Sequence, residues 1–251
     1  MAKVKTKKII SAGLLQIEAI YPRRDKRDSE RARAAKSHAS SEVQRRMNRI
    51  HSYQKLELIL AANYRPGDLW VTVTYDDAHL PENRKQAKAC FNRFLTKLRD
   101  ARRARHRDCV VASNTEHKHL SDNLWEDRRW HHHFFLNVTD GDDFAEIRHC
   151  WGYGSVIEIR FFDLEGDHSY EAAARYMCKE QPDKVGAHCW SVTRNAKRPE
   201  VETVRVEADE DVQPPKGSRI LFNEGGQGRY GWRVVKYLLP ETRKKRRRRR
   251  R

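Results

Sequence analysis

The strongest constraint on the fold is the segment RWHHHFFLN at residues 129–137, in which three consecutive histidines lead into an apolar run. The segment suits a β-strand, whose successive side chains point to opposite faces of a sheet. We expect His131 and His133 on one face, about 7 Å apart, and His132 and Phe134 on the other face, where His132 would be structural. Two imidazoles spaced in this way can bind one divalent cation. The segment therefore predicts a sheet that carries a candidate metal site.

A carboxylate is expected beside this histidine pair. Residues 109–116 read as a strand that ends at Glu116, and residues 117–127 read as a polar hairpin loop that returns the chain antiparallel. Two imidazoles and a carboxylate suit Mg²⁺ or Mn²⁺ acting on a phosphate. His117 and His119, in the expected loop, are alternative ligands. The competing interpretation is that the histidines are satisfied core residues with no ligand.

A second candidate feature is the segment AAARYMCKE at residues 172–180. Its alanines favour a helix that packs closely against a sheet, and we expect this helix to start at residue 166 or 167. Tyr176 and Lys179 are three residues apart and would share one helix face, where the ammonium could neutralise a phosphate or favour a tyrosinate. A helical tyrosine is more often a packing residue, and Tyr170 is a rival nucleophile on a different helix face.

Hydrophobic periodicity gives an α+β order of elements: strand, helix, strand, strand, helix, strand, helix. We expect an antiparallel central sheet with helices packed on one of its faces, a basic N-terminal arm and a basic C-terminal tail. Residues 9–21 read as one strand. The four parts predicted are residues 1–41 (N-terminal strand and basic arm), 42–198 (catalytic domain), 199–242 (C-terminal extension) and 243–251 (polybasic tail). The expected core elements are helices at 43–60, 87–98 and 142–151 and strands at 69–75, 155–162 and 231–239.

Charge and cysteine content narrow the partners. The chain carries a formal charge of +17, from 52 lysines and arginines against 35 acidic residues, which favours a polyanion such as nucleic acid. The five cysteines form no CxxC pair, which argues against a zinc ribbon and for reduced thiols in the cytoplasm. No long apolar stretch is present, so we expect no membrane partner.

With these residues in place, the chain resembles the HUH endonucleases, in particular rolling-circle replication initiators of phages, plasmids and related mobile elements. Residues 69–77, LWVTVTYDD, are similar to the first motif of that family, and residues 129–133 to its metal motif. The run YMCK at 176–179 is similar to its third motif, and Trp151 and Gly154 also fit. The resemblance extends from about Ile9 to Arg198. One departure is the third histidine, which stands where the family has a bulky residue.

The resemblance implies an HUH/RRM-like fold and a function. His131, His133 and Glu116 would hold Mg²⁺ or Mn²⁺, and Tyr176 would attack single-stranded or hairpin origin DNA with help from Lys179. A 5′-phosphotyrosine link and a free 3′-hydroxyl would result, and the hydroxyl would prime host polymerase. Trp130 and basic residues would hold the DNA strand. The P-loop pattern GxxxxGK[ST] is absent, so a host helicase would be needed.

Three alternatives stay open at this stage. A relaxase or transposase would use the same chemistry. A non-catalytic, basic DNA-binding protein would tolerate phenylalanine at position 176. A metal-dependent hydrolytic nuclease would cleave without a covalent adduct.

Overall fold

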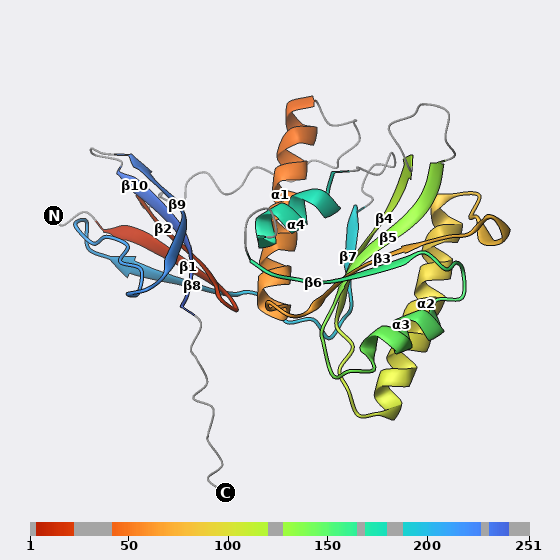
Figure 1. Ribbon diagram of the computed structural model, residues 1–251. Coiled ribbons are helices and arrows are strands. Elements are labelled where there is room, and N and C mark those ends of the chain that lie inside the picture. The colour runs from red at the N-terminus through yellow and green to blue at the C-terminus, as the bar shows by residue number, and fades with distance from the viewer. Residues whose placement is uncertain are drawn as a thin grey trace, which may run out of the picture. The chain divides into compact units, whose positions relative to one another are not determined.

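A computed structural model describes residues 4–22, 42–119, 128–164, 169–179, 188–226 and 231–240. The chain forms two compact units (Figure 1): residues 37–197 make up the larger, and residues 1–36 together with 198–251 the smaller. The basic arm predicted before residue 42 and the polybasic tail predicted at 243–251 lie outside the described residues. None of the described helices is both long and apolar enough to cross a membrane.

The larger unit is built on a five-stranded antiparallel sheet with the strand order β6-β3-β5-β4-β7. Its strands are β3 (Leu69–Thr74), β4 (Val111–His119), β5 (Arg128–Leu136), β6 (Ile157–Phe161) and β7 (Trp190–Val192). Its helices are α1 (Glu42–Asn63), α2 (Arg84–Ala104), α3 (Asp143–Cys150) and α4 (Tyr170–Met177), with a short 3₁₀ turn, η2 (Asp77–His79). The α+β architecture, the antiparallel sheet and the order of the elements from β3 to α4 are as predicted.

Helices cover both faces of this sheet, whereas the sequence led us to expect them on one face. The pair α1 and α4 lies on one side and the pair α2 and α3 on the other (Figure 1). Phe91 of α2 stacks on His132 with ring centroids 4.4 Å apart, while Tyr176 of α4 contacts His133 on the opposite face. The reason lies in β5 itself, because residues 131–136 are all buried, and a strand buried on both faces needs a layer on each.

Two chain breaks position the larger unit. Gly67 follows α1 with φ +96°, a left-handed conformation that favours glycine, and turns the chain into β3. The helix of Tyr176 begins at Tyr170 rather than at residue 166 or 167, which lie outside the described residues. Ser169 caps it, since its side-chain oxygen accepts the N–H of Ala172 at 3.1 Å.

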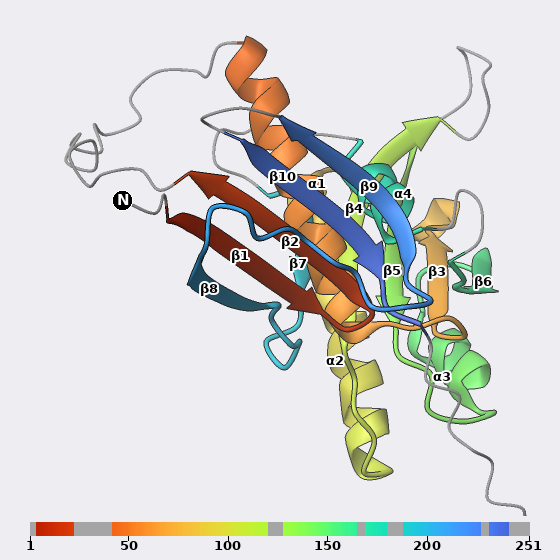
Figure 2. The ribbon, with the colours of Figure 1, turned by 90° about the vertical axis from the view of Figure 1, so that its left-hand side faces the viewer.

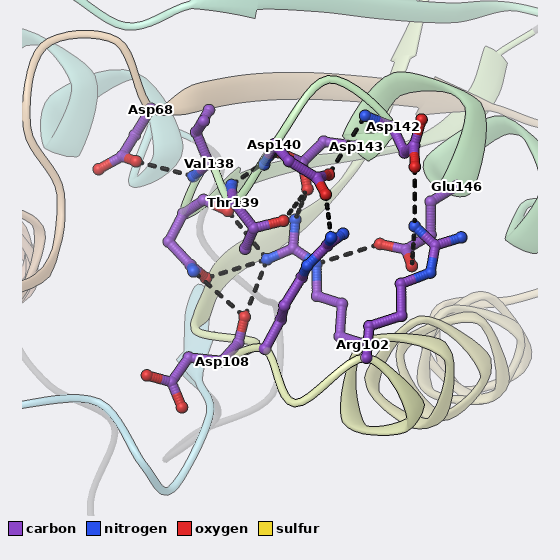
Figure 3. Close-up of polar contacts among 12 residues, drawn as sticks. Asp68, Arg102, Asp108, Val138, Thr139, Asp140, Asp142, Asp143 and Glu146 are labelled. Atoms are coloured by element: carbon purple, nitrogen blue, oxygen red, sulfur yellow. Dashed lines mark hydrogen bonds and ion pairs between the residues drawn. The ribbon is translucent and has the colours of Figure 1, made fainter.

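A buried arginine ties α2 to α3 and to the end of β5 (Figure 3). Arg102 is completely buried and donates to Asp143 at 2.7 Å and to Glu146 at 3.2 Å. It also donates to the backbone oxygens of Asp108 and Asn137, at 3.0 and 2.8 Å. Every charge at this junction therefore has a partner, as buried charges require.

The smaller unit joins the two ends of the chain in a second antiparallel sheet, with the strand order β8-β1-β2-β10-β9 (Figure 2). Its strands are β1 (Lys5–Ala12), β2 (Leu15–Pro22), β8 (Glu200–Val206), β9 (Arg219–Gly226) and β10 (Trp232–Leu238). The prediction of one strand over 9–21 is wrong, because Gly13, at φ +58°, closes a hairpin that folds this segment back on itself. The strand predicted at 231–239 is confirmed as β10.

Candidate active site

The histidine pair lies on one face of β5, opposite two threonines of β3. Thr74 pairs with His131 and Thr72 with His133 in the antiparallel register. The Oγ1 atoms of these threonines lie 2.8 Å from Nδ1 of His131 and 2.9 Å from Nδ1 of His133. When each Nδ1–H donates to its threonine, the lone pair that can bind a cation is on Nε2. The threonines thus orient both imidazoles in the way that metal-binding histidines require.

Glu116 lies beside this pair, as predicted, because β4 places it directly opposite His131. Its side chain is buried, and Oε2 lies 3.5 Å from Nε2 of His133. Oε1 accepts from Nδ2 of Asn114 at 2.9 Å. Burial alone would raise the pKa of Glu116, but the hydrogen bond and charge of His133, the charge of Lys179 and the Asn114 amide outweigh it and lower the pKa to about 2. Glu116 is therefore an ionised carboxylate at neutral pH.

Tyr176 and Lys179 lie against the same histidines. The Tyr176 hydroxyl is 3.4 Å from Nε2 of His133, and its ring contacts those of His133 and Trp70 at centroid distances of 5.1 and 5.7 Å. Lys179 lies beyond the end of α4 rather than within the helix. Its ammonium is nevertheless 3.5 Å from the Tyr176 ring centroid and 3.3 Å from Oε2 of Glu116. The structure therefore brings together all five residues singled out in the sequence: Glu116, His131, His133, Tyr176 and Lys179.

His132 points to the opposite face, as expected, and packs in the core. Its Nε2 lies 2.8 Å from the Tyr75 hydroxyl and its Nδ1 3.1 Å from Oγ1 of Thr115. Because the Tyr75 hydroxyl donates to the Ala87 carbonyl, the proton in the first contact belongs to Nε2 of His132. Burial lowers the pKa of His132 well below its ordinary value, with the charges of His133 and His131 adding to the effect, so His132 is neutral.

Three other candidates are placed outside the site. Tyr170 is buried and donates its hydroxyl to the Tyr64 carbonyl at 2.6 Å, so it is a packing residue rather than a nucleophile. His117 lies in β4, not in a loop, and stacks on Trp130 with ring centroids 4.3 Å apart. It is one residue beyond Glu116 and so faces the other side of the sheet. Trp130 belongs to the core cluster rather than to an exposed DNA contact. His119 ends β4, and its side chain is outside the described residues.

The donor set fits a hard divalent cation in its chemistry. Two imidazoles held through Nδ1 and one ionised carboxylate are ligands that Mn²⁺ and Mg²⁺ accept. As the side chains stand, no three His, Cys, Asp or Glu residues in the described part of the chain are already arranged around one point. The ligand roles of His131, His133 and Glu116 stay predictions.

Residues 68–181, somewhat less than half of the chain, match the model of a replication-associated protein family, the ORF2 type. This segment belongs to that replication-associated protein family. Neither the curated proteins nor the solved structures gave a match. The family supports a rolling-circle replication initiator, and the matched segment includes all five candidate site residues.

Within this replication-associated segment, the structure adds residues to which the sequence analysis gave no role. Thr72 and Thr74 hold the imidazoles, Asn114 holds Glu116, and Trp70 packs on Tyr176. Polar residues at alternate positions of an otherwise apolar strand were the available signal for the threonines. The strand register that pairs them with the histidines is visible only in the fold.

Trp151 and Gly154, which fitted the family resemblance, support the end of β3. Nε1 of Trp151 donates to the Thr74 carbonyl at 3.3 Å. A Cβ on Gly154 would lie 2.4 Å from that same carbonyl oxygen, so only glycine allows the chain to pass this closely. Both residues therefore fix the backbone at Thr74, which contacts His131.

Proposed function

We propose that this replication initiator nicks single-stranded DNA at an origin by covalent attack of Tyr176. The observation that carries the proposal is the 3.4 Å approach of the Tyr176 hydroxyl to His133, beside a buried, ionised Glu116. A nucleophile next to residues that can hold a cation and a lysine is the set of groups that phosphodiester transfer needs.

In the proposed reaction the phenolate oxygen of Tyr176 forms a bond to phosphorus, and the bond from phosphorus to the 3′ oxygen breaks. The phenol gives up its proton, and the departing 3′ oxygen gains one. The products are a 5′-phosphotyrosine on the downstream strand and a free 3′-hydroxyl that host polymerase can extend. Reversal of the same step joins a 3′-hydroxyl to the phosphotyrosine and closes a circle.

The residues around the tyrosine have separate tasks. The ammonium of Lys179, 3.5 Å from the Tyr176 ring centroid, favours the phenolate and offsets charge on the phosphate. His131, His133 and Glu116 would hold Mg²⁺ or Mn²⁺, which when bound polarises the scissile phosphate. Thr72 and Thr74 keep the imidazoles aimed at that position.

The test uses single-stranded oligonucleotides from the protein's own replicon, labelled at either end, with Mn²⁺ and denaturing gels. We expect 3′ label to move onto the protein and 5′ label to appear on a shorter fragment that polymerase extends. Tyr176→Phe should abolish both while DNA binding persists. Tyr170→Phe is the matched control and should retain the adduct, because that hydroxyl is buried away from the site.

Two outcomes would contradict the proposal. Cleavage without a covalent adduct, or cleavage that survives Tyr176→Phe, would instead indicate a hydrolytic nuclease that uses activated water. Binding without cleavage across a tiled set of oligonucleotides spanning the whole replicon would indicate a DNA-binding protein.

A further inference from the structure

The two faces of the sheet in the smaller unit differ in character. One face carries the apolar cluster of this unit, formed by Ile20, Val206, Val212, Val235 and Tyr237. The opposite face, here called the aromatic face, is formed by the alternate residues of the same strands. It carries three aromatic rings and a set of cations: Tyr21, Phe222, Trp232, Lys8, Arg205 and Lys236.

All three aromatic side chains of this face are exposed, at 37% for Tyr21, 41% for Phe222 and 43% for Trp232. Exposure of three large rings on one sheet is not needed for folding, because the unit already has its apolar cluster on the other face. Large exposed apolar groups gathered on one surface mark an interaction site more often than chance.

The strand register places rings and cations side by side. Ile20 pairs with Arg233, so the next pair along the β2–β10 ladder is Tyr21 with Trp232. Trp232 also pairs with Gly226, whose missing side chain leaves room for the indole, since a Cβ there would lie 2.9 Å from Nε1. These two rings are therefore neighbours on adjacent strands, about 5 Å apart at the backbone.

The third ring lies further along the same face, next to a lysine. Phe222 pairs with Lys236, which is four residues from Trp232 along β10, a separation of about 13 Å. On the other side, Arg205 pairs with Thr6, and Thr6 pairs with Tyr21, so the guanidinium belongs to the same row as the tyrosine. The rings are thus flanked by cations at both ends.

Charge separates the two faces as clearly as the rings do. Along the strands the aromatic face has four cations and one acid: Lys8, Arg205, Arg219, Lys236 and Glu224. On the opposite face acids outnumber cations, and Glu210 and Asp211 add to them by pairing with Lys7 and Arg233. The strand residues there are the acids Glu18, Glu200 and Glu202 and the cations Lys5, Lys7 and Arg233. The aromatic face is therefore the one that attracts anions.

Exposed rings among cations suit one class of ligand in particular. Unpaired bases stack on aromatic side chains while the phosphates between them meet lysine and arginine. A duplex hides the flat faces of its bases and would leave the rings unused. A protein partner is disfavoured, since lysine is depleted from the centre of protein interfaces.

We propose that the aromatic face is a second binding surface for single-stranded DNA, separate from the Tyr176 site. It holds the strand by stacking on Tyr21, Trp232 and Phe222 and by phosphate contacts from Lys8, Arg205 and Lys236. It requires no cleavage chemistry and stands whether or not Tyr176 is a nucleophile.

The test measures binding of the full-length protein to a fluorescent oligo(dT) 20-mer by anisotropy, in EDTA so that no cleavage contributes. Trp232→Leu combined with Phe222→Leu removes two stacking rings and keeps every charge, including the polybasic tail. We expect at least a tenfold loss of affinity. The matched control is Phe161→Leu, an exposed aromatic residue in β6 of the other unit, with less than a twofold change.

Two further probes separate stacking from charge. An abasic 20-mer with the same phosphates should bind the wild type and the double variant equally, because it offers no rings. Lys8→Gln combined with Arg205→Gln should flatten the dependence of affinity on salt, whereas Lys5→Gln on the opposite face should leave it unchanged.

The proposal is overturned if the double variant binds oligo(dT) as the wild type does. It is also overturned if the variant loses affinity for the abasic strand by the same factor, or if it changes only the melting temperature or the oligomeric state. That last result would mean that the rings cover another part of this chain or a second copy of it.

Discussion

The buried Arg102 provides the most quantitative prediction for the larger unit. We expect Arg102→Leu to lower the free energy of unfolding by about 3–5 kcal/mol, the usual cost of removing one partner from a buried ion pair. The structure favours the lower end of this range. Asp143 keeps three other hydrogen bonds, from Thr139 N–H at 2.7 Å, Thr139 Oγ1 at 2.6 Å and Asp140 N–H at 3.0 Å. The loss therefore falls mainly on Glu146 and on the two carbonyls that Arg102 binds.

The measurement is urea unfolding followed by tryptophan fluorescence, in which the midpoint should fall while the slope stays constant. Arg103→Leu is the matched control. It is the next residue of the same helix, its side chain is 72% exposed, and it pairs only with Asp100 on the surface, so its effect should stay within about 0.5 kcal/mol.

A double variant tests the reasoning rather than the size of the effect. Arg102→Leu combined with Glu146→Leu removes both members of one pair and should be more stable than Arg102→Leu alone, because no carboxylate is left buried without a partner at that position. The argument would be refuted if Arg102→Leu cost less than 1 kcal/mol, or if the double variant were the less stable of the two.

Three further predictions concern the same unit. Burial would raise the pKa of Asp143, but its hydrogen bonds to Thr139 and Asp140 and the charge of Arg102 lower it; Asp143→Asn should therefore cost most stability at neutral pH, and its deficit should shrink as pH falls below the ordinary value of 3.8, as urea unfolding at several pH values would show. Gly154→Ala should lower stability by about 1–3 kcal/mol because its Cβ would meet backbone, whereas Gly152→Ala, with nothing within 4 Å, should leave the melting temperature nearly unchanged. Thr74→Val should weaken Mn²⁺ binding, measured by calorimetry, about 10–100-fold without loss of fold, and unchanged affinity would show that the contact with His131 does not orient a ligand.

Local sequence patterns determined the face of each histidine and the order of the elements in the larger unit. A strand places alternate side chains on opposite faces whatever surrounds it, so His131 and His133 had to share a face and His132 had to oppose them. The same rule, with the antiparallel return of β4, placed Glu116 beside them. Patterns with a period of two or of 3.6 residues depend on covalent geometry and need no knowledge of distant residues.

The tertiary structure decided everything that depends on pairing between distant segments. The register of β3 against β5 joined Thr72 and Thr74 to the histidines, and the packing of α4 brought the Tyr176 hydroxyl to His133, 43 residues away. Helices on both sheet faces, and a sheet that joins the first strands of the chain to the last, follow from which apolar surfaces bury one another. That choice is made between segments far apart in sequence, where no local periodicity acts.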